Sequence, residues 1–512
     1  MRIVEVDGDG LDIRDVVDVA RGRATARLAE GVGVRMERSR RVVVDAVERG
    51  AVMYGITTGF GALADTHIGR ADIERLQLSL LRSHAAGVGD PLTDDVVRGL
   101  LLLRARTLAA GYSGVRVDLP RRLLELLDRG LLPVVPGKGS VGASGDLAQL
   151  AHLALPLVGE GRLRRAGGPP DGVPAAELLA DEGLTPLVLD AKEGLSLING
   201  TEPMQVLLAL AIAESDLLVR VADVACACSV DGLLGTNRPF DERVQALRPH
   251  PGQLASARNL RALLDGSPLM RSHRESDHAV QDSYSLRCSP QVHGAVRDVL
   301  DHARRTLRVE LGAVVDNPVI VADGEVMTTG NFHGEPLAFA GDMLAMALSE
   351  LASIAERRVD RMLDPAFSRG LPPFLAERAG TNSGYMLAQY TAASLVSENK
   401  VLAHPSSVDT IPTSGNQEDH VSMGWTSMRK LHDVVANVRS VLAVELVCAM
   451  QALDFRSSIA PSSPAVEAAR AVVRREVPAM PVDREVTPQL RAAEGLLAEI
   501  VSAVETVTGG LD

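Results

Sequence analysis

Apolar side chains in the second half of the chain recur at helical spacing over long stretches. In residues 335–363, Leu337, Leu344, Leu348 and Leu351 lie three, four or seven positions apart, which places them on one face of an α-helix. Similar patterns cover four further ranges: 204–234, 291–315, 383–402 and 420–455. A helix rises about 1.5 Å per residue, so these helices would be roughly 30–50 Å long. The pattern predicts a mainly α protein built as a bundle of long helices.

The first half of the chain is broken into shorter pieces. Gly55, Gly59 and Gly61 punctuate residues 54–61, and residues 167–174 read GGPPDGVP, which is typical of a loop. We therefore expect an irregular N-terminal part over residues 1–200 and a long-helix bundle over residues 201–512. Several helical stripes are apolar around much of their circumference, which favours packing between subunits as well as within one.

Composition narrows the class of protein. Of the 512 residues, 46% are hydrophobic but only 3% are aromatic, so the core must be aliphatic. The net charge of −13 argues against nucleic acid as the main partner, because phosphate binding needs a basic face. We find no signal-peptide pattern, membrane span or glycine-rich nucleotide motif. The expectation is a cytoplasmic protein with neither nucleic-acid nor membrane partners and no nucleotide cofactor.

Cysteine and histidine spacing does not predict a metal centre. Cys226 and Cys228 form the only close cysteine pair, and they lie in an apolar helical pattern without a second pair at zinc-site spacing. Buried thiols are the favoured interpretation. His152, His333, His404 and His420 show no metal-binding spacing either. We therefore expect no catalytic metal. This leaves the source of any catalytic chemistry to be found elsewhere.

Residues 139–147 read GSVGASGDL and interrupt a leucine-rich sequence with three glycines and two serines. The Gly145 nitrogen can approach the carbonyl carbon of Ala143, because Gly145 has no side chain in the way. Ring closure with loss of one water, then loss of a second water from Ser144, would give a methylidene-imidazolone. This group is an electrophile, which no ordinary side chain supplies. The other interpretations are a helix N-cap at Ser144 and a simple turn.

Seven segments give this tripeptide its context. In chain order they are YGITTGFG from Tyr54, SHAAGVG from Ser83, GSVGASGDLAQLAHLAL from Gly139, KEGLSLINGT from Lys192, VQDSYSLRCSPQVHGA from Val280, GNFHGEP from Gly330 and NQEDHVSMG from Asn416. Together they resemble the aromatic amino acid ammonia-lyase and aminomutase family over essentially the whole chain. The resemblance implies a fumarase/aspartase-like helical architecture, with the cofactor 4-methylidene-imidazol-5-one formed from Ala143-Ser144-Gly145. It also implies a homotetramer whose active sites mix residues from three chains.

The resemblance assigns roles to matching residues. Tyr54 would take a β-proton from the substrate, so its pKa, about 10 for a free phenol, would have to be lowered. Arg287 would pair with the substrate carboxylate through its planar guanidinium group. The remaining matches are Asn199, Gln281 and Tyr284, which would orient the electrophile and the carboxylate, and Phe332, which would pack against the substrate or the ring. By itself, Arg287 reads as a surface charge and the others as polar groups at helix ends or in loops.

Two features resemble the histidine-preferring branch of the family. His84 follows Ser83 at the position of the family's selectivity pair, and Glu418 lies in the NQEDHVSMG segment. A site built to hydrogen-bond a polar ring rejects an apolar ring, because its own polar groups would be left unpaired. The implied reaction is loss of ammonia from L-histidine to give trans-urocanate. Without the resemblance, His84 reads as a core or surface histidine and Glu418 as part of a solvated face.

Three residues depart from the family pattern, and three alternatives stay open. The departures are Glu202, Ser283 and His293, which lie near or behind the implied site. The nearest alternative is a histidine 2,3-aminomutase, which would return ammonia to the β-carbon and release β-histidine with the same cofactor. A second is a fumarase-like lyase without a self-made cofactor, although its serine loop is not found. A third is a helical scaffold or binding protein, which would keep an ordinary backbone mass.

Overall fold

The structure is a computed structural model that describes residues 2–53, 58, 69, 72–142, 145–275 and 280–512. It divides into two compact units. The first unit comprises Met1–Leu210, Ala303–Gly341 and Pro405–Arg429, and the second comprises Ala211–His302, Asp342–His404 and Lys430–Asp512. Each unit is assembled from three separate segments of the chain. The expected division at residue 200 stays a prediction.

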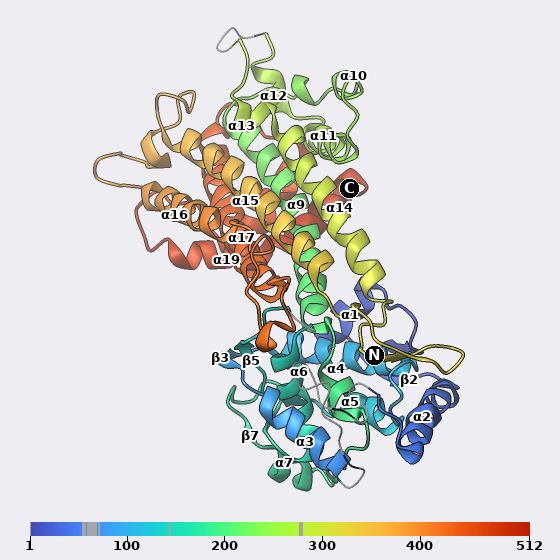
Figure 1. Cartoon of the computed structure of the whole chain (residues 1–512). Helices are drawn as coiled ribbons and strands as arrows, with labels where there is room; N and C mark the ends of the chain where they lie inside the picture. Colours follow the sequence, from blue (N-terminus) through green and yellow to red (C-terminus); the bar gives the residue numbers. More distant parts are fainter. Residues whose placement is uncertain (1, 54–57, 59–68, 70–71, 143–144, 276–279) are drawn as a thin grey trace. The chain divides into compact units, whose positions relative to one another are not determined.

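The first unit combines short helices with small sheets (Figure 1). Its helices are α1 (Ile13–Ala20), α2 (Val32–Arg49), α3 (Ile73–His84), α4 (Asp94–Ala109), α5 (Asp118–Asp128), α6 (Leu147–Ala154), α7 (Ala175–Asp181) and α8 (Glu193–Ile198). Its strands are β1 (Arg2–Val6), β2 (Ala24–Leu28), β3 (Val88–Pro91), β4 (Leu131–Pro133), β5 (Pro136–Lys138), β6 (Arg162–Arg165), β7 (Val173–Pro174), β8 (Val319–Ile320) and β9 (Val326–Met327). Short 3-10 helices η3 (Leu155–Val158) and η6 (Ser414–Asn416) also belong to it.

The sheets of the first unit join segments that are far apart in sequence. Strands β1 and β2 pair in parallel, and β4, β6 and β7 form an antiparallel sheet. Strand β3 pairs with β5, so the chain that follows α3 lies beside the segment that leads into residues 139–147. A Cβ at Gly139 would lie 3.1 Å from the Cα of Gly87. This close approach fixes the end of α3 against the candidate cofactor segment.

The secondary-structure elements assigned to the second unit's described residues are all helices, joined by loops. Its helices are α10 (Glu242–Gln245), α11 (Pro251–Leu264), α12 (Pro268–Ser272), α13 (Tyr284–Arg287), α16 (Met386–Leu402), α18 (Pro464–Glu476) and α19 (Thr487–Thr508), with 3-10 helices η4 (Arg238–Phe240) and η5 (Pro373–Leu375). Four longer helices have residues in both units: α9 (Glu202–Gly232), α14 (Ser289–Glu310), α15 (Glu335–Leu363) and α17 (Gly424–Arg456). The helical fold class is confirmed.

The five long helices predicted from the apolar pattern are all present. Helix α15 covers the predicted range, whereas α14 ends at Glu310 rather than 315, and α17 begins at Gly424 rather than 420. Gly312 follows the end of α14, and Met423 has a positive φ of 52°, a conformation that does not continue into an α-helix. The backbone conformation at these two ends therefore stops each helix before the limit that the apolar pattern predicts.

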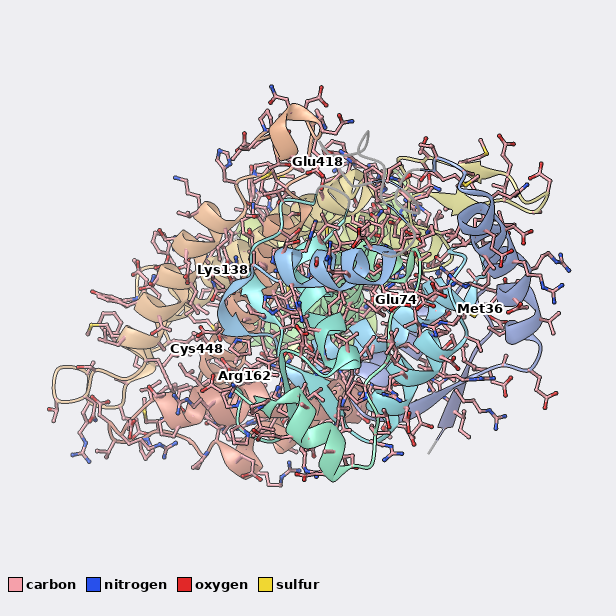
Figure 2. All side chains as sticks on the ribbon, turned by 60° about the horizontal axis from the view of Figure 1, so that its bottom comes forward. Met36, Glu74, Lys138, Arg162, Glu418 and Cys448 are labelled. Atoms are coloured by element: carbon pink, nitrogen blue, oxygen red, sulfur yellow. The ribbon has the colours of Figure 1, made fainter. Side chains whose placement is uncertain are left out.

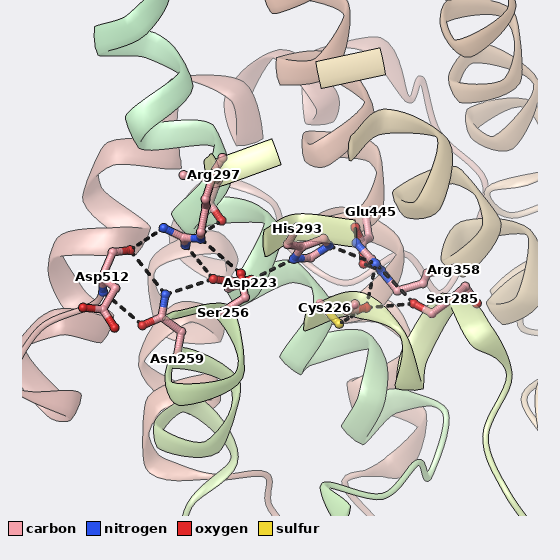
Figure 3. A network of polar contacts seen from close by, with 12 residues as sticks. Asp223, Cys226, Ser256, Asn259, Ser285, His293, Arg297, Arg358, Glu445 and Asp512 are labelled. Atoms are coloured by element: carbon pink, nitrogen blue, oxygen red, sulfur yellow. Dashed lines mark hydrogen bonds and ion pairs between the residues drawn. The ribbon is translucent and has the colours of Figure 1, made fainter. Parts of the chain in front are cut away.

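Polar side chains join the long helices inside the second unit (Figure 3). On α14, the His293 Nδ1 lies 2.7 Å from the Asp223 carboxylate on α9, and the Arg358 Nε on α15 donates to the Glu445 carboxylate on α17 at 2.5 Å. All four side chains are fully buried. The helices are thus fastened by paired charges as well as by aliphatic packing.

The cysteines are free thiols. Cys226 and Cys228 are buried, as predicted. Cys448, labelled in Figure 2, is also buried, and Cys288 is half-buried. Burial raises the pKa of Cys226 to about 11, and its thiol donates to the Ser289 hydroxyl at 3.1 Å. The Cys226 thiol is therefore a protonated part of the core.

Some apolar side chains on two helices remain exposed. On α15 they are Phe339, Met343 and Met346, and on α16 they are Leu387 and Tyr390. Among the described residues, α15 alone has the length and apolar composition of a membrane span, and 61% of its apolar window is buried inside the structure. That burial is the behaviour of a core helix.

Candidate active site

Of the three residues predicted to form the cofactor, the structure describes Gly145, which lies in a tight turn. This residue has φ +77° and forms a parallel bridge with Gly200. A Cβ here would lie 1.9 Å from the Gly200 carbonyl oxygen, so only glycine fits. The Asp146 amide donates to the same oxygen at 2.9 Å. Ala143 and Ser144, the other two residues of the predicted ring, lie outside the described residues.

A buried carboxylate follows the turn directly. Asp146 accepts hydrogen bonds from the Ser140 hydroxyl at 2.6 Å and from the Met204 amide at 3.2 Å. Burial raises its pKa to about 7, although both hydrogen bonds oppose the rise. Asp146 can therefore hold or release a proton near neutral pH. The sequence prediction missed this residue, because an acidic residue before a helix, here α6, normally reads as a cap.

The other side of the turn packs against the segment before α17. The Met423 amide donates to the Val141 carbonyl at 2.9 Å. A Cβ at Gly142 would lie 2.1 Å from the Ser422 hydroxyl oxygen. The described residues on either side of Ala143 and Ser144 are thus held by different segments: Val141 and Gly142 contact residues 422–424, whereas Gly145 and Asp146 contact residues 200–204.

Asn199 lies beside Gly200 and is almost fully buried. Its amide nitrogen donates to the Asn317 carbonyl at 3.0 Å, while its Oδ1 has no hydrogen-bond partner among the described residues. The Arg104 guanidinium donates to the Asn199 carbonyl at 2.9 Å and forms a fully buried ion pair with Glu202 at 3.1 Å. Glu202, which departs from the family pattern, therefore pairs with the arginine that supports the Asn199 backbone.

His84 is half-buried at the end of α3. Its Nδ1 lies 2.9 Å from the Leu80 carbonyl oxygen and 3.1 Å from the Ser83 hydroxyl. A carbonyl can only accept, so this contact assigns the proton to Nδ1 and leaves a lone pair on Nε2. His84 can therefore accept a hydrogen bond from an N–H group of a ligand.

Glu418 and Phe332 belong to the same unit as His84. Glu418, labelled in Figure 2, is half-buried, and its carboxylate accepts from the Thr413 hydroxyl at 2.6 Å. A backbone bridge between the same two residues also holds their main chains together. Phe332 is also half-buried. Two residues later, a Cβ at Gly334 would lie 2.4 Å from the Met204 side chain, which ties this segment to the start of α9.

The remaining predicted site residues lie in the second unit. On α13, the Arg287 guanidinium lies over the Tyr284 ring at 4.6 Å from its centre. Tyr284 is 70% exposed, while the buried Nε of Arg287 has no partner among the described residues. Gln281 lines a cavity of about 390 Å³ whose walls include four arginines: Arg238, Arg271, Arg274 and Arg369. Asp265 and Asp282 also line it, and Arg369 pairs with Asp282, so the walls carry charges of both signs. Sequence reasoning did not single out these four arginines.

The two units thus hold different parts of the predicted site. The first unit contains His84, Gly145, Asn199, Phe332 and Glu418, and it brings Gly200, the residue after Asn199, against Gly145. The second contains Gln281, Tyr284 and Arg287. Tyr54 lies outside the described residues.

Comparison with known proteins decides the family. The sequence profile described as aromatic amino acid lyase matches residues 11–475. The chain belongs to the aromatic amino acid lyase family. A histidine ammonia-lyase from Gloeobacter violaceus is 50% identical over 510 residues, covering 99% of this chain and 98% of the relative.

Solved structures of the aromatic amino acid lyase family and its neighbours agree. The histidine ammonia-lyase from Trypanosoma cruzi matches with a TM-score of 0.90 and 39% identity, covering 99% of this chain and 95% of that one. The tyrosine aminomutase from Streptomyces globisporus matches with a TM-score of 0.92 and 37% identity over 98% of both chains. The family resemblance drawn from the seven segments is confirmed. The roles of the individual site residues stay predictions.

Proposed function

We propose that the chain eliminates ammonia from L-histidine to give trans-urocanate, using a methylidene-imidazolone formed from Ala143, Ser144 and Gly145. The turn at Gly145 carries this proposal, because a glycine-only backbone and a buried carboxylate meet there. The 50% identity to a histidine ammonia-lyase over nearly the whole chain supports the substrate. We also propose that the protein is a soluble cytoplasmic enzyme whose substrate is a small amino acid.

The residues around the turn fit the proposed group. Asn199 presents a buried Oδ1 that has no partner within the described part of the chain, and the Gly200 carbonyl lies directly against Gly145. Such an unpaired acceptor, close to the turn, is suited to a polar group that an unmodified backbone does not provide. When formed, the group supplies an electrophilic methylene to which a substrate amine can add. Asn199, Gly200 and Asp146 would hold it in place.

Two side chains of the first unit account for a preference for histidine. His84 offers a lone pair on Nε2 and Glu418 offers a carboxylate, so both are acceptors for an imidazole N–H. An apolar aromatic ring would leave these acceptors unpaired, and the free-energy cost of burying them unpaired would weaken the binding of such a ring. The pair thus favours a ring that carries N–H donors.

Two further roles are proposed for Arg287, in the second unit, and for Tyr54, which lies outside the described residues. Arg287 would bind the substrate carboxylate with its planar donors, and Tyr54 would remove the β-proton. We further propose a homotetramer whose active sites combine residues of three chains. The exposed Tyr284 and the exposed apolar side chains of α15 and α16 support this assembly. Light scattering checks the mass, and co-expression of inactive Tyr54→Phe and Arg287→Ala chains would restore activity only if sites are shared.

The decisive experiment on the cofactor is the intact mass of the purified chain with and without Ser144. The wild type should lack two waters relative to its sequence, whereas Ser144→Ala should keep the second water and lose nearly all turnover of L-histidine. Ser457→Ala, which removes an exposed hydroxyl after α17, is the matched control and should match the wild type in both readouts. An Ser144→Ala enzyme with near-normal turnover would end the proposal.

The product distinguishes the two reactions that share this cofactor. A tyrosine aminomutase is among the similar solved structures, so histidine 2,3-aminomutase is the second candidate function. Incubation with L-histidine, followed by separate quantification of urocanate and β-histidine, decides between them. We expect urocanate as the main product; predominant β-histidine would establish the aminomutase instead.

Substrate selectivity tests the two acceptors. His84→Leu and Glu418→Gln should each lower kcat/KM for L-histidine far more than they lower the unfolding temperature. Their effect on L-phenylalanine turnover should be small or opposite, because that ring has no N–H to place. Unchanged selectivity in both variants would refute the assignment of these residues.

A further inference from the structure

Three potential metal ligands converge in the first unit from two distant segments. Glu335 is the first residue of α15, His333 lies two positions before it, and His420 lies shortly before α17. One ligand atom from each of these side chains lies within 4.8 Å of the other two. The two imidazole rings have their centres 5.6 Å apart. Spacing along the sequence does not reveal this cluster, because 87 residues separate His333 from His420.

The contacts of His333 select one tautomer. Its Nε2 lies 3.3 Å from the His420 carbonyl oxygen, which can only accept, so Nε2 carries the proton. The Glu335 amide then points at the Nδ1 lone pair over a long 3.4 Å. An Nδ1 ligand whose other nitrogen donates to a backbone carbonyl is the usual arrangement of a metal-bound histidine. Nδ1 is therefore the nitrogen that His333 offers to a metal ion, which would displace the weak hydrogen bond from the Glu335 amide.

Glu335 provides an independent sign that the cluster is incomplete. Its Oε2 is buried and has no hydrogen-bond partner among the described residues. A buried carboxylate oxygen normally has a partner, since leaving it unpaired costs free energy. The helix N-terminus favours the negative charge but does not pair this atom. A cation between Glu335 and the two imidazoles would do so.

We propose that His333, Glu335 and His420 form a binding site for a divalent transition-metal ion of the Zn²⁺ class. Two imidazole nitrogens and one carboxylate oxygen suit zinc and its neighbours, whereas calcium and magnesium prefer oxygen ligands only. The ligand atoms, which lie within 4.8 Å of one another, would have to move closer together to reach metal–ligand distances of about 2.0–2.2 Å, and the exposed side chain of His420 leaves room for that movement. Water would complete the coordination shell.

The ion would link two segments that carry proposed substrate-binding residues without using those residues as ligands. Phe332 directly precedes His333, and Glu418 lies two positions before His420. Metal binding would therefore hold the 418–420 segment against the start of α15 and raise the stability of the first unit by mass action. This inference does not depend on which reaction the enzyme catalyses.

The test is direct Zn²⁺ binding to the full-length, tag-free protein, measured by competition with a chromophoric chelator. We expect one tight site per chain, weakened roughly tenfold or more by Glu335→Gln and by His420→Ala. His250→Ala, which removes an exposed histidine before α11, is the matched control and should bind as the wild type does. A Cys288→Ser background removes the half-buried thiol as a competing ligand.

The outcomes separate this site from the proposed reaction. Binding lost in Glu335→Gln and His420→Ala, and kept in Cys288→Ser, supports the site whatever the product of L-histidine turnover. Equal zinc affinity in the wild type and His420→Ala overturns it, as does binding that disappears with Cys288. A Zn²⁺-dependent rise in unfolding temperature, present in the wild type and absent in Glu335→Gln, is the second expected readout.

Discussion

Each unit buries a group of charged side chains, and the two groups differ in how completely their atoms are paired. In the second unit, the Asp223 carboxylate accepts from His293, Arg297 and Asn259, and Glu445 accepts from Arg358 and Ser229 (Figure 3). No described side-chain nitrogen or oxygen of Asp223, His293, Arg297, Arg358 or Glu445 is buried without a partner.

The buried group of the first unit is left partly unpaired. Arg104 and Glu202 form an ion pair, yet Glu202 Oε1 and two Arg104 nitrogens have no well-aligned hydrogen bond to any residue that the structure describes. Among those residues Asn199 Oδ1 has no partner either, and burial raises the pKa of Asp146 to about 7. A fully paired buried network holds helices together, whereas unpaired buried groups mark a place prepared for chemistry. The difference separates the structural network from the candidate active site.

Breaking the paired network should produce the largest loss of stability. Arg358→Met leaves Glu445 buried without its main counter-charge, a change that costs about 3–5 kcal/mol. The unfolding temperature should fall sharply, and the double variant Arg358→Met/Glu445→Leu should recover part of the loss. Arg475→Met is the control, because its pair with Glu499 is about half exposed and such pairs contribute about 0–1 kcal/mol. Equal effects of Arg358→Met and Arg475→Met would contradict the distinction.

Asp146 should make stability depend on pH in the first unit. Its pKa rises from 3.8 to about 7 on folding, so the native state holds the proton more tightly than the unfolded state does. The resulting stabilisation is fully present below about pH 4 and is lost as the pH rises through about 7. Asp146→Asn carries no charge, so its stability relative to wild type should improve by up to about 4 kcal/mol between pH 4 and 8.

The measurement is the unfolding temperature of both proteins across this pH range. Asp45→Asn, which changes an exposed carboxylate on α2, is the control and should follow the wild-type profile. Parallel profiles for wild type and Asp146→Asn would show that the buried carboxyl does not titrate as the geometry indicates.

The long helices could be predicted from sequence, because a repeating apolar face is a local property. The range 335–363 needed no correction, while the ends of α14 and α17 were set by Gly312 and by the positive φ of Met423. Such end effects depend on backbone conformations that apolar periodicity does not encode.

The partners of buried charges could not be predicted in the same way. Arg104 lies inside the leucine-rich helix α4, and its partner Glu202 is 98 positions away in sequence. Asp146 reads as a helix cap, yet its side chain bonds Ser140 and the distant Met204 amide instead of the start of α6. The segments could be matched to a family, but the pairing of their charges requires the fold.

The smallest expected effect comes from one hydroxyl in each group. Ser140 donates to Asp146 at 2.6 Å, and Ser229 donates to Glu445 at 2.7 Å. Ser140→Ala should cost about 1–2 kcal/mol, more at pH 8 than at pH 5, because the lost bond favours the charged form of Asp146. In an Asp146→Asn background this pH dependence should vanish. Ser229→Ala should cost a similar amount at both pH values, since Arg358 still pairs with Glu445; a pH-dependent loss there would erase the contrast between the two groups.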